Sequence, residues 1–182
     1  MNRPYARHTR LLHKIHHCDV LAFTWCMQRR HQAVFTWISK VVSRSADGFY
    51  YPCIPLLAYA AGSAEASSLF LALALGFAIE RPLYLVLKNG LKRDRPAQAM
   101  PGFASFIAPS DQFSFPSGHT SGAFLAATVV AAFFPGLTEA LYCWATLVGA
   151  ARVFLGVHFP TDVFAGAIIG ATIGTIGIAT LV

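Results

Sequence analysis

Long apolar segments separated by short polar clusters are the feature that most restricts the fold of this chain. The segments lie at about residues 50–63, 66–91, 118–134, 138–157 and 161–181. A helix needs about 20 apolar residues to cross a bilayer, a length that the first segment does not reach alone. We therefore predict an all-α, multi-pass transmembrane helical bundle with five spans, or six if the N-terminal region also crosses.

The composition supports the membrane class. Of the 182 residues, 55% are hydrophobic and only 12% are charged, about half the charged share of an ordinary soluble domain. The first residues are basic, but no signal-length apolar run with a small-residue cleavage site follows them, so no secretory signal is expected. The net charge of +6 is interpreted as contact with anionic lipid headgroups, and nucleic acid is not expected as a partner.

The N-terminal region, residues 1–46, differs from the rest because cations and apolar residues alternate along it. Arg29 and Arg30 lie near its middle, so a membrane span there would bury two arginines at roughly 2.5–3.5 kcal/mol each. Two amphipathic helices lying in the membrane interface avoid that cost, and the tryptophans of this region suit that depth. We predict a basic interfacial arm that contacts anionic headgroups, followed by a membrane-embedded domain over residues 47–182.

Three polar clusters interrupt the apolar part of the chain. They are Lys88 to Arg95-Pro96, then Pro116-Ser117-Gly118-His119, and then Arg152, His158 and Asp162. No predicted span separates the first cluster from the second, and two spans separate the second from the third. All three clusters are therefore expected on the same face of the membrane.

The cations and small residues of these clusters are suited to binding a phosphate group. Lys88, Arg95 and Arg152 supply positive charge that can stabilise the oxyanions of a pentacoordinate transition state. Ser117 and the backbone N–H of Gly118, near a predicted helix start, can add hydrogen bonds to the same phosphate. These groups could hold a phosphate ester without a metal ion or other cofactor.

The two histidines are candidates for the steps that break and form bonds. His158 and Asp162 are four residues apart at a helix start, so the carboxylate can fix the ring tautomer and leave the other nitrogen as the nucleophile. His119 is then the general acid that protonates the leaving group. A phosphohistidine at His158 would be hydrolysed by water, with His119 acting as the base.

The order and spacing of these residues resembles the signature of a known family. The chain resembles the three-part signature of the type-2 phosphatidic acid phosphatase and vanadium haloperoxidase superfamily in Lys88-x6-Arg95-Pro96, Pro116-Ser117-Gly118-His119 and Arg152-x5-His158-x3-Asp162. The resemblance covers about residues 47–180. It implies a helical bundle with the site described above, in which Lys88, Arg95, Ser117, Gly118 and Arg152 bind phosphate, His119 is the acid, and His158 with Asp162 forms the nucleophile pair.

The chain departs from the family pattern at two points. Ala151 stands where the family usually has serine, so one hydrogen bond to phosphate is expected to be missing. Integral members usually have six spans, and here the interfacial arm takes the place of the first.

The expected function is that of a metal-independent membrane phosphatase acting through a phosphohistidine. Candidate substrates are phosphatidic acid, phosphatidylglycerophosphate, undecaprenyl diphosphate and lipid A phosphates. The alternative from another class is a non-catalytic protein that binds or transports lipid phosphates on the same fold. Such a protein would be expected to have lost one histidine, whereas His119 and His158 are both present.

The distribution of cations bears on which membrane face carries the site. The turns on the opposite side, near residues 64–66 and 135–138, contain no Lys or Arg. The positive-inside rule then places the clusters at the cytoplasmic face of the cell (inner) membrane. Analogy with bacterial members of the family favours the outer, periplasmic face, so both placements stay open here.

Two further features of the apolar segments invite alternative interpretations. Gly166, Gly170 and Gly174 recur every four residues, which lets helices approach closely, either within the chain or across a homodimer. Glu80 and Arg81 lie in the middle of a predicted span. Charges in such a position either have a structural role in the bundle interior or form a polar floor beneath the substrate headgroup.

Overall fold

In the computed structural model, all regular elements of the described residues, 5–28 and 33–180, are helical. Side chains are described from residue 16 onward, and Arg29 and Arg30 lie outside the described residues. The α-helices are α1 Tyr5–Gln28, α2 Ala33–Arg44, α3 Cys53–Ala60, α4 Ala66–Leu91, α5 Pro96–Ala99, α6 Gly118–Phe133, α7 Thr138–Phe154 and α8 Pro160–Ala179, with short 3-10 turns η1 Gly48–Tyr50 and η2 Pro135–Leu137. The predicted all-α class is confirmed for this part of the chain.

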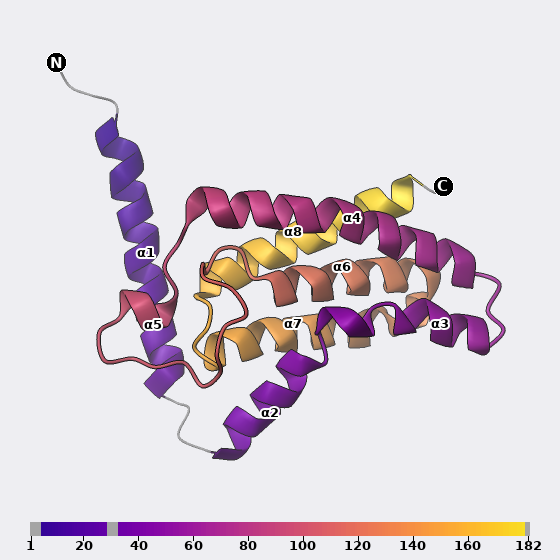
Figure 1. The fold of residues 1–182 in the computed structure, drawn as a ribbon, viewed down its shortest axis with the longest axis horizontal. Helices are drawn as coiled ribbons and strands as arrows, with labels where there is room; N and C mark the ends of the chain where they lie inside the picture. Colours follow the sequence, from indigo (N-terminus) through magenta and orange to yellow (C-terminus); the bar gives the residue numbers. More distant parts are fainter. Residues whose placement is uncertain (1–4, 29–32, 181–182) are drawn as a thin grey trace.

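The long helices α4, α6, α7 and α8 form a bundle in which α6 is central (Figure 1). Helix α6 packs against α4, α7 and α8, and α4 also packs against α8. The core between them consists of large apolar side chains that are at most 5% exposed, among them Leu69, Leu73, Leu125, Val129 and Ile173. For helices in a bilayer, whose lipid tails are as apolar as these side chains, it is the van der Waals packing between the side chains that holds the helices together.

Helices α6 and α8 approach closely because glycines of α8 face the backbone of α6. A Cβ added at Gly170 would lie 2.1 Å from the carbonyl oxygen of Ser121, and one added at Gly166 would lie 2.6 Å from that of Ser117. Only a residue without a side chain fits at such a distance. This face of α8 is thus covered by α6 of the same chain, and a dimer through it would require the two helices to separate.

Membrane-span criteria of length and hydropathy are met by two described helices. They lie in Ala66–Ala99, which contains α4, and in Pro160–Ala179, which is α8, while α6 is apolar but shorter. The first predicted segment, 50–63, contains only the eight-residue helix α3. The boundaries of α4 agree with the predicted 66–91, but the count of five spans remains a prediction.

The N-terminal helices lie against one end of the bundle (Figure 1). Helix α2 packs on α7, and α1 contacts α7 and α8. Phe23 of α1 is fully buried between Phe103 and Phe159, with ring centroids 5.2 and 5.5 Å away. Helices α1 and α2 therefore pack on the bundle, while Trp37 and other apolar side chains of α2 stay exposed. The interfacial position of this region remains a prediction.

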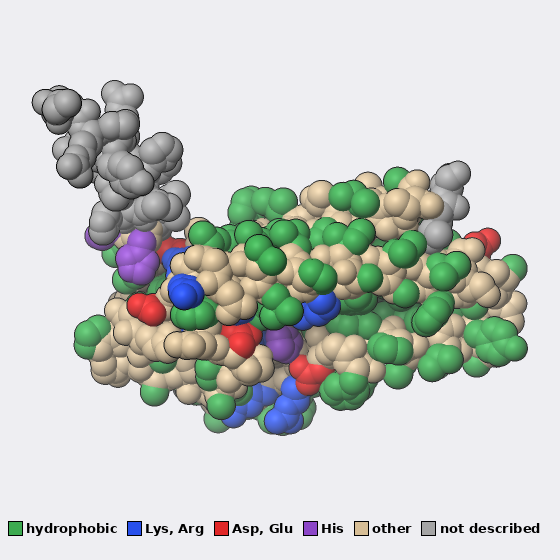
Figure 2. Space-filling model, turned by 45° about the horizontal axis from the view of Figure 1, so that its top comes forward, with side chains coloured by type: hydrophobic (Ala, Val, Ile, Leu, Met, Phe, Trp, Pro, Cys, Tyr) green, Lys and Arg blue, Asp and Glu red, His purple; other side chains and the backbone are tan. Residues whose placement is uncertain are grey.

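Hydrophobic side chains cover much of the surface along the bundle (Figure 2). Most of the charged side chains on the face shown gather in its left half, toward the end where α1 and α2 lie, with a histidine visible among them. An apolar face with charged groups gathered toward one end is the distribution expected of a protein that sits in a bilayer.

Candidate active site

The predicted site residues come from four helix ends that meet at one end of the bundle. Most of them lie at the C-terminal ends of α4 and α7 or at the N-terminal ends of α6 and α8, while Arg95 directly precedes α5 and His158 lies in the connection between α7 and α8. A cavity of about 470 Å³ lies among these ends. His119 and His158 line the same cavity together with Arg152 and Gly118, so the structure brings together residues that lie far apart in the sequence.

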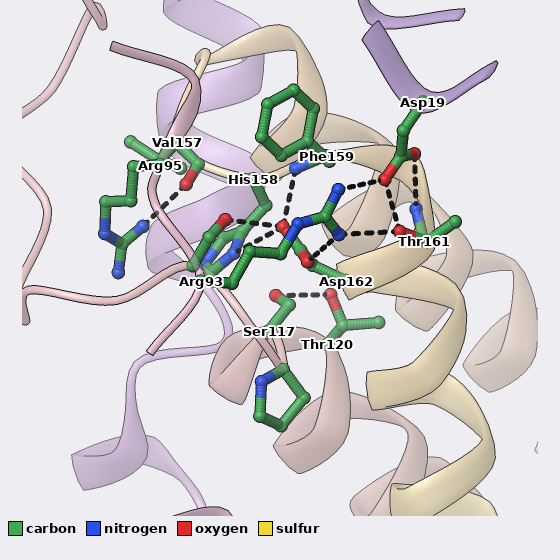
Figure 3. Close-up of polar contacts among 12 residues, drawn as sticks. Asp19, Arg93, Arg95, Ser117, Thr120, Val157, His158, Phe159, Thr161 and Asp162 are labelled. Atoms are coloured by element: carbon green, nitrogen blue, oxygen red, sulfur yellow. Dashed lines mark hydrogen bonds and ion pairs between the residues drawn. The ribbon is translucent and has the colours of Figure 1, made fainter. Parts of the chain in front are cut away.

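His158 and Asp162 are neighbours, but the pair is looser than expected. The distance from His158 Nδ1 to Asp162 Oδ2 is 3.7 Å, which is too long for a hydrogen bond. The carboxylate already accepts a hydrogen bond of 2.8 Å from the backbone N–H of Phe159 (Figure 3), and another from the hydroxyl of Ser114. Asp162 can therefore orient His158 electrostatically, and a small ring movement would be needed for a direct bond.

The burial of His158 determines its charge. The side chain is 2% exposed, and burial, helped by the nearby Arg152 and Arg95 cations, lowers its pKa to about 3. Desolvation disfavours the protonated imidazolium. The ring is therefore neutral at physiological pH, which is the state a nucleophilic nitrogen requires.

Arg93, which the sequence analysis did not single out, holds Asp162 from the other side. Its guanidinium donates to Asp162 Oδ1 at 2.6 Å and to Thr161 Oγ1 at 2.7 Å, and it also pairs with Asp19 of α1 (Figure 3). Asp19 in turn accepts the backbone N–H of Thr161 at 3.0 Å. This network ties the N-terminal helix to the start of α8, directly beside the candidate nucleophile.

Replacing Arg93 by alanine is expected to reduce the free energy of unfolding by about 3 kcal/mol. Its partners Asp19 and Asp162 have side chains that are at most 1% exposed, and both would be left without their cation. Thermal unfolding in detergent measures the effect, with Arg44→Ala as the control because Arg44 is an exposed cation of α2. Equal melting temperatures for the two variants would show that the network adds nothing to stability.

Lys88 and Arg95 lie together, as their proposed shared role requires, and both are buried. The structure adds a counter-ion that the sequence analysis missed. Asp111 Oδ1 is 2.9 Å from Lys88 Nζ and 2.6 Å from Arg95 Nη2, and its Oδ2 accepts a hydrogen bond of 2.6 Å from the hydroxyl of Tyr84. Asp111 lines the same cavity as the histidines, whereas Lys88 and Arg95 are not among its lining residues, so within this cluster the carboxylate is the group that reaches the cavity.

Arg152 is a candidate phosphate ligand with one N–H group that is free to bind a ligand. It is 3% exposed, and its Nη1 donates to Ser43 Oγ at 2.8 Å. Its Nε has no hydrogen-bond partner among the described residues. A buried N–H without an acceptor is costly, so a guanidinium lining the cavity in this state is suited to receive an oxygen of a ligand.

His119 contacts a carboxylate that the sequence analysis also missed. Its Nε2 is 3.0 Å from Oδ1 of Asp47, which follows α2. The side chain of His119 is 24% exposed, so it is the more accessible of the two histidines. A carboxylate at this distance can hold the ring in one orientation, which suits a residue that must donate a proton along a defined direction.

Ser117 and Gly118 differ in what they can contribute. Ser117 is fully buried, and its hydroxyl pairs with Thr120 Oγ1 at 2.9 Å (Figure 3), so it makes no capping bond to the helix backbone. Ser117 is also not among the residues lining the cavity, whereas Gly118 is. A Cβ at Gly118 would lie 2.8 Å from the Tyr84 ring, which explains the glycine.

Arg81 reaches the same cavity, whereas Glu80 is fully buried behind it. The two side chains pair with each other, with Arg81 Nη2 2.7 Å from Glu80 Oε1. The guanidinium also lies over the Tyr84 ring, 4.7 Å from its centroid. Glu80 therefore belongs to the bundle interior and Arg81 forms part of the cavity wall, while a polar floor beneath the substrate headgroup remains a prediction.

The chain is similar to known proteins in both sequence and fold. The family model of the PAP2 superfamily matches residues 65–181. Phosphatidylglycerophosphatase B of Bacillus subtilis is 34% identical over 149 residues, which are 74% of this chain and 70% of that protein. The lipid A 1-phosphatase of Rhizobium johnstonii is 42% identical over 92 residues, 47% of this chain but only 37% of that protein. The solved structure of LpxE from Aquifex aeolicus has a TM-score of 0.78 at 27% identity, covering 88% of this chain and 94% of that chain.

Proposed function

Because this chain belongs to the PAP2 superfamily, we propose that it is a membrane phosphatase that acts on a lipid phosphomonoester or a prenyl diphosphate. The observation that carries the proposal is that both histidines and the buried Arg152 line one cavity. The names of the similar proteins agree with it, since they are phosphatases of lipid A and of phosphatidylglycerophosphate. Lipid phosphates are thus the substrate class proposed for this chain.

In the proposed reaction, His158 Nε2 attacks the phosphorus atom and the bond to the leaving-group oxygen breaks. His119 donates its ring proton to that oxygen, so the lipid alcohol or lipid phosphate leaves in its protonated form. Water then attacks the phosphorus atom of the phosphohistidine while His119 accepts a proton from the water. The bond between phosphorus and His158 Nε2 breaks, its electron pair returns to the ring nitrogen, and phosphate is released. Lys88, Arg95 and Arg152 stabilise the charge on the phosphoryl oxygens in both steps, together with the backbone N–H of Gly118.

The apolar lining of the cavity supports a lipid as the substrate. Beyond the histidines its wall is apolar and is formed mainly by α3, α4 and the turn before α3, with Tyr51, Pro55, Phe70, Leu73 and Phe77. Such a wall can accommodate a hydrocarbon chain while the phosphate lies among the cations. We propose that residues 47–182 are embedded in the membrane and that α1 and α2 lie along its interface, where the exposed apolar side chains of α2 would enter the lipid.

Phosphate release from a panel of lipid phosphates by the purified protein in EDTA tests this function. The panel contains phosphatidic acid, phosphatidylglycerophosphate, undecaprenyl diphosphate and lipid A. We expect at least one of them to be hydrolysed at a rate that EDTA leaves unchanged and that vanadate, an analogue of the pentacoordinate transition state, inhibits. Lipid binding without any phosphate release would instead support a non-catalytic protein, and a loss of rate in EDTA would contradict the metal-independent mechanism.

A further inference from the structure

The cation pair that should bind phosphate is already occupied by a carboxylate of the same chain. Lys88 Nζ has three N–H donors and three acceptors, namely Tyr84 Oη at 2.7 Å, Asp111 Oδ1 at 2.9 Å and the carbonyl of Pro116 at 3.5 Å. Arg95 donates to the carboxylate and the backbone carbonyl of Asp111, at 2.6 and 3.0 Å. Arg95 also donates to the carbonyl of Val157 at 2.6 Å. Both cations are therefore engaged in this conformation, and Asp111 is the acceptor that they share.

Asp111 carries a full negative charge in this position. Burial opposes its ionisation, but the hydrogen bonds from Tyr84 and Lys88 and the charge of Lys88 outweigh burial and lower its pKa to about 2. A phosphate group placed on the same cations would bring about two negative charges next to this carboxylate. Repulsion at such a distance disfavours simultaneous binding, so phosphate and Asp111 compete for the same donors.

The carboxylate can move more easily than the cations. The side chain of Asp111 is 32% exposed, compared with 5% for Lys88 and 3% for Arg95. Asp111 lies in the segment between α5 and α6, which has no helix from residue 100 to residue 117. Three residues further on, the segment is held by Ser114, whose backbone N–H donates a hydrogen bond of 2.7 Å to the carbonyl of Arg93. Release of Asp111 into solvent would therefore leave the cations in place.

We propose that Asp111 exchanges with the phosphate group in each turnover, leaving Lys88 and Arg95 when substrate binds and returning when the product phosphate departs. This inference rests on the proposed function, because it takes these cations as the phosphate site. The tethered carboxylate acts as an intramolecular competitor at high effective concentration. It lowers the affinity for every phosphate ligand by the same factor, and it thereby favours product release.

The first test measures the binding of inorganic phosphate by calorimetry at pH 8, without any hydrolysis. If the state with Asp111 on the cations is about 90% populated, its removal raises phosphate affinity about tenfold. We expect this gain in Asp111→Asn, and no change in Asp94→Asn, which removes an exposed carboxylate from the neighbouring segment between α4 and α5. Unchanged or weaker binding in Asp111→Asn would overturn the proposal and would assign Asp111 a purely positioning role.

A second measurement uses the wild-type protein and does not depend on the folding of a variant. Hydrogen–deuterium exchange of the peptide 107–114 is compared with and without inorganic phosphate. Exchange with Asp111 predicts that phosphate increases deuterium uptake in this peptide, because its anchor on the cations is lost. Decreased uptake would contradict the proposal. Both readouts are separate from lipid hydrolysis, so the absence of turnover on the lipid panel would reject the proposed function without deciding this inference.

Discussion

Replacing His158 by glutamine is expected to reduce phosphate release from the best lipid substrate by about 10⁴-fold or more. Removal of a catalytic nucleophile typically costs this much, because the remaining groups can still bind the transition state but cannot form the covalent intermediate. Glutamine has nearly the volume of histidine, which limits the cavity left at a side chain that is only 2% exposed. Steady-state phosphate release in detergent micelles measures the effect.

The control for this variant is His17→Gln, which changes an exposed histidine of α1 and should leave the rate within about twofold of wild type, as distant surface changes usually do. Thermal unfolding shows whether the His158 variant keeps its fold. If it does and yet retains more than about one hundredth of the wild-type rate, another group must be the nucleophile. Rapid quenching of the wild-type protein with phosphate-labelled substrate should in turn trap label on the protein, and none should be trapped on the glutamine variant.

Replacing Gly170 by alanine is expected to destabilise the bundle by about 3 kcal/mol or more, at the upper end of overpacking costs. The added Cβ would lie 2.1 Å from the carbonyl oxygen of Ser121 and 2.9 Å from the backbone nitrogen of Leu125. These are backbone atoms of α6, so the clash can be relieved only by moving the two helices apart. Because α6 carries His119 and α8 carries Asp162, activity should fall together with stability.

Gly90→Ala is the matched control, because it places the same substitution in a helix where nothing lies within 4 Å of the new Cβ. Alanine is the better helix former, so this variant should gain about 0.5–1 kcal/mol. The two substitutions should therefore shift the unfolding midpoint in opposite directions. Equal midpoints would mean that α6 and α8 are not packed as closely as the structure indicates.

The helices and the three polar clusters could be predicted because their signals are local. A continuous apolar run bounded by polar residues predicts a helix such as α4 almost to the residue, since the run and the helix share the same physical cause. The shortness of α3 was harder to foresee. The run at 50–63 is apolar over its length, yet a turn precedes the helix at Gly48–Tyr50 and the helix itself ends at Ala60.

The acidic partners of the site could not be predicted in the same way. Asp47 contacts His119 and Asp19 contacts Arg93, although these pairs are separated by 72 and 74 residues along the chain. No spacing rule connects such distant positions. One weak signal was available: the chain has only eight acidic residues, and in a membrane protein a carboxylate is too costly to bury without a partner.

The sequence by itself determined the all-helical class, the positions of the long helices α4, α6, α7 and α8, and the residue types that we propose to bind and cleave a phosphate ester, because periodicity and motif spacing are properties of neighbouring residues. Only the tertiary structure decided which donors are available. It pairs the Ser117 hydroxyl with Thr120, leaves Arg152 Nε without a partner among the described residues, and places Asp111 on the Lys88–Arg95 pair. These outcomes depend on how helix ends and loops meet in space, where a shift of about 1 Å makes or breaks a hydrogen bond.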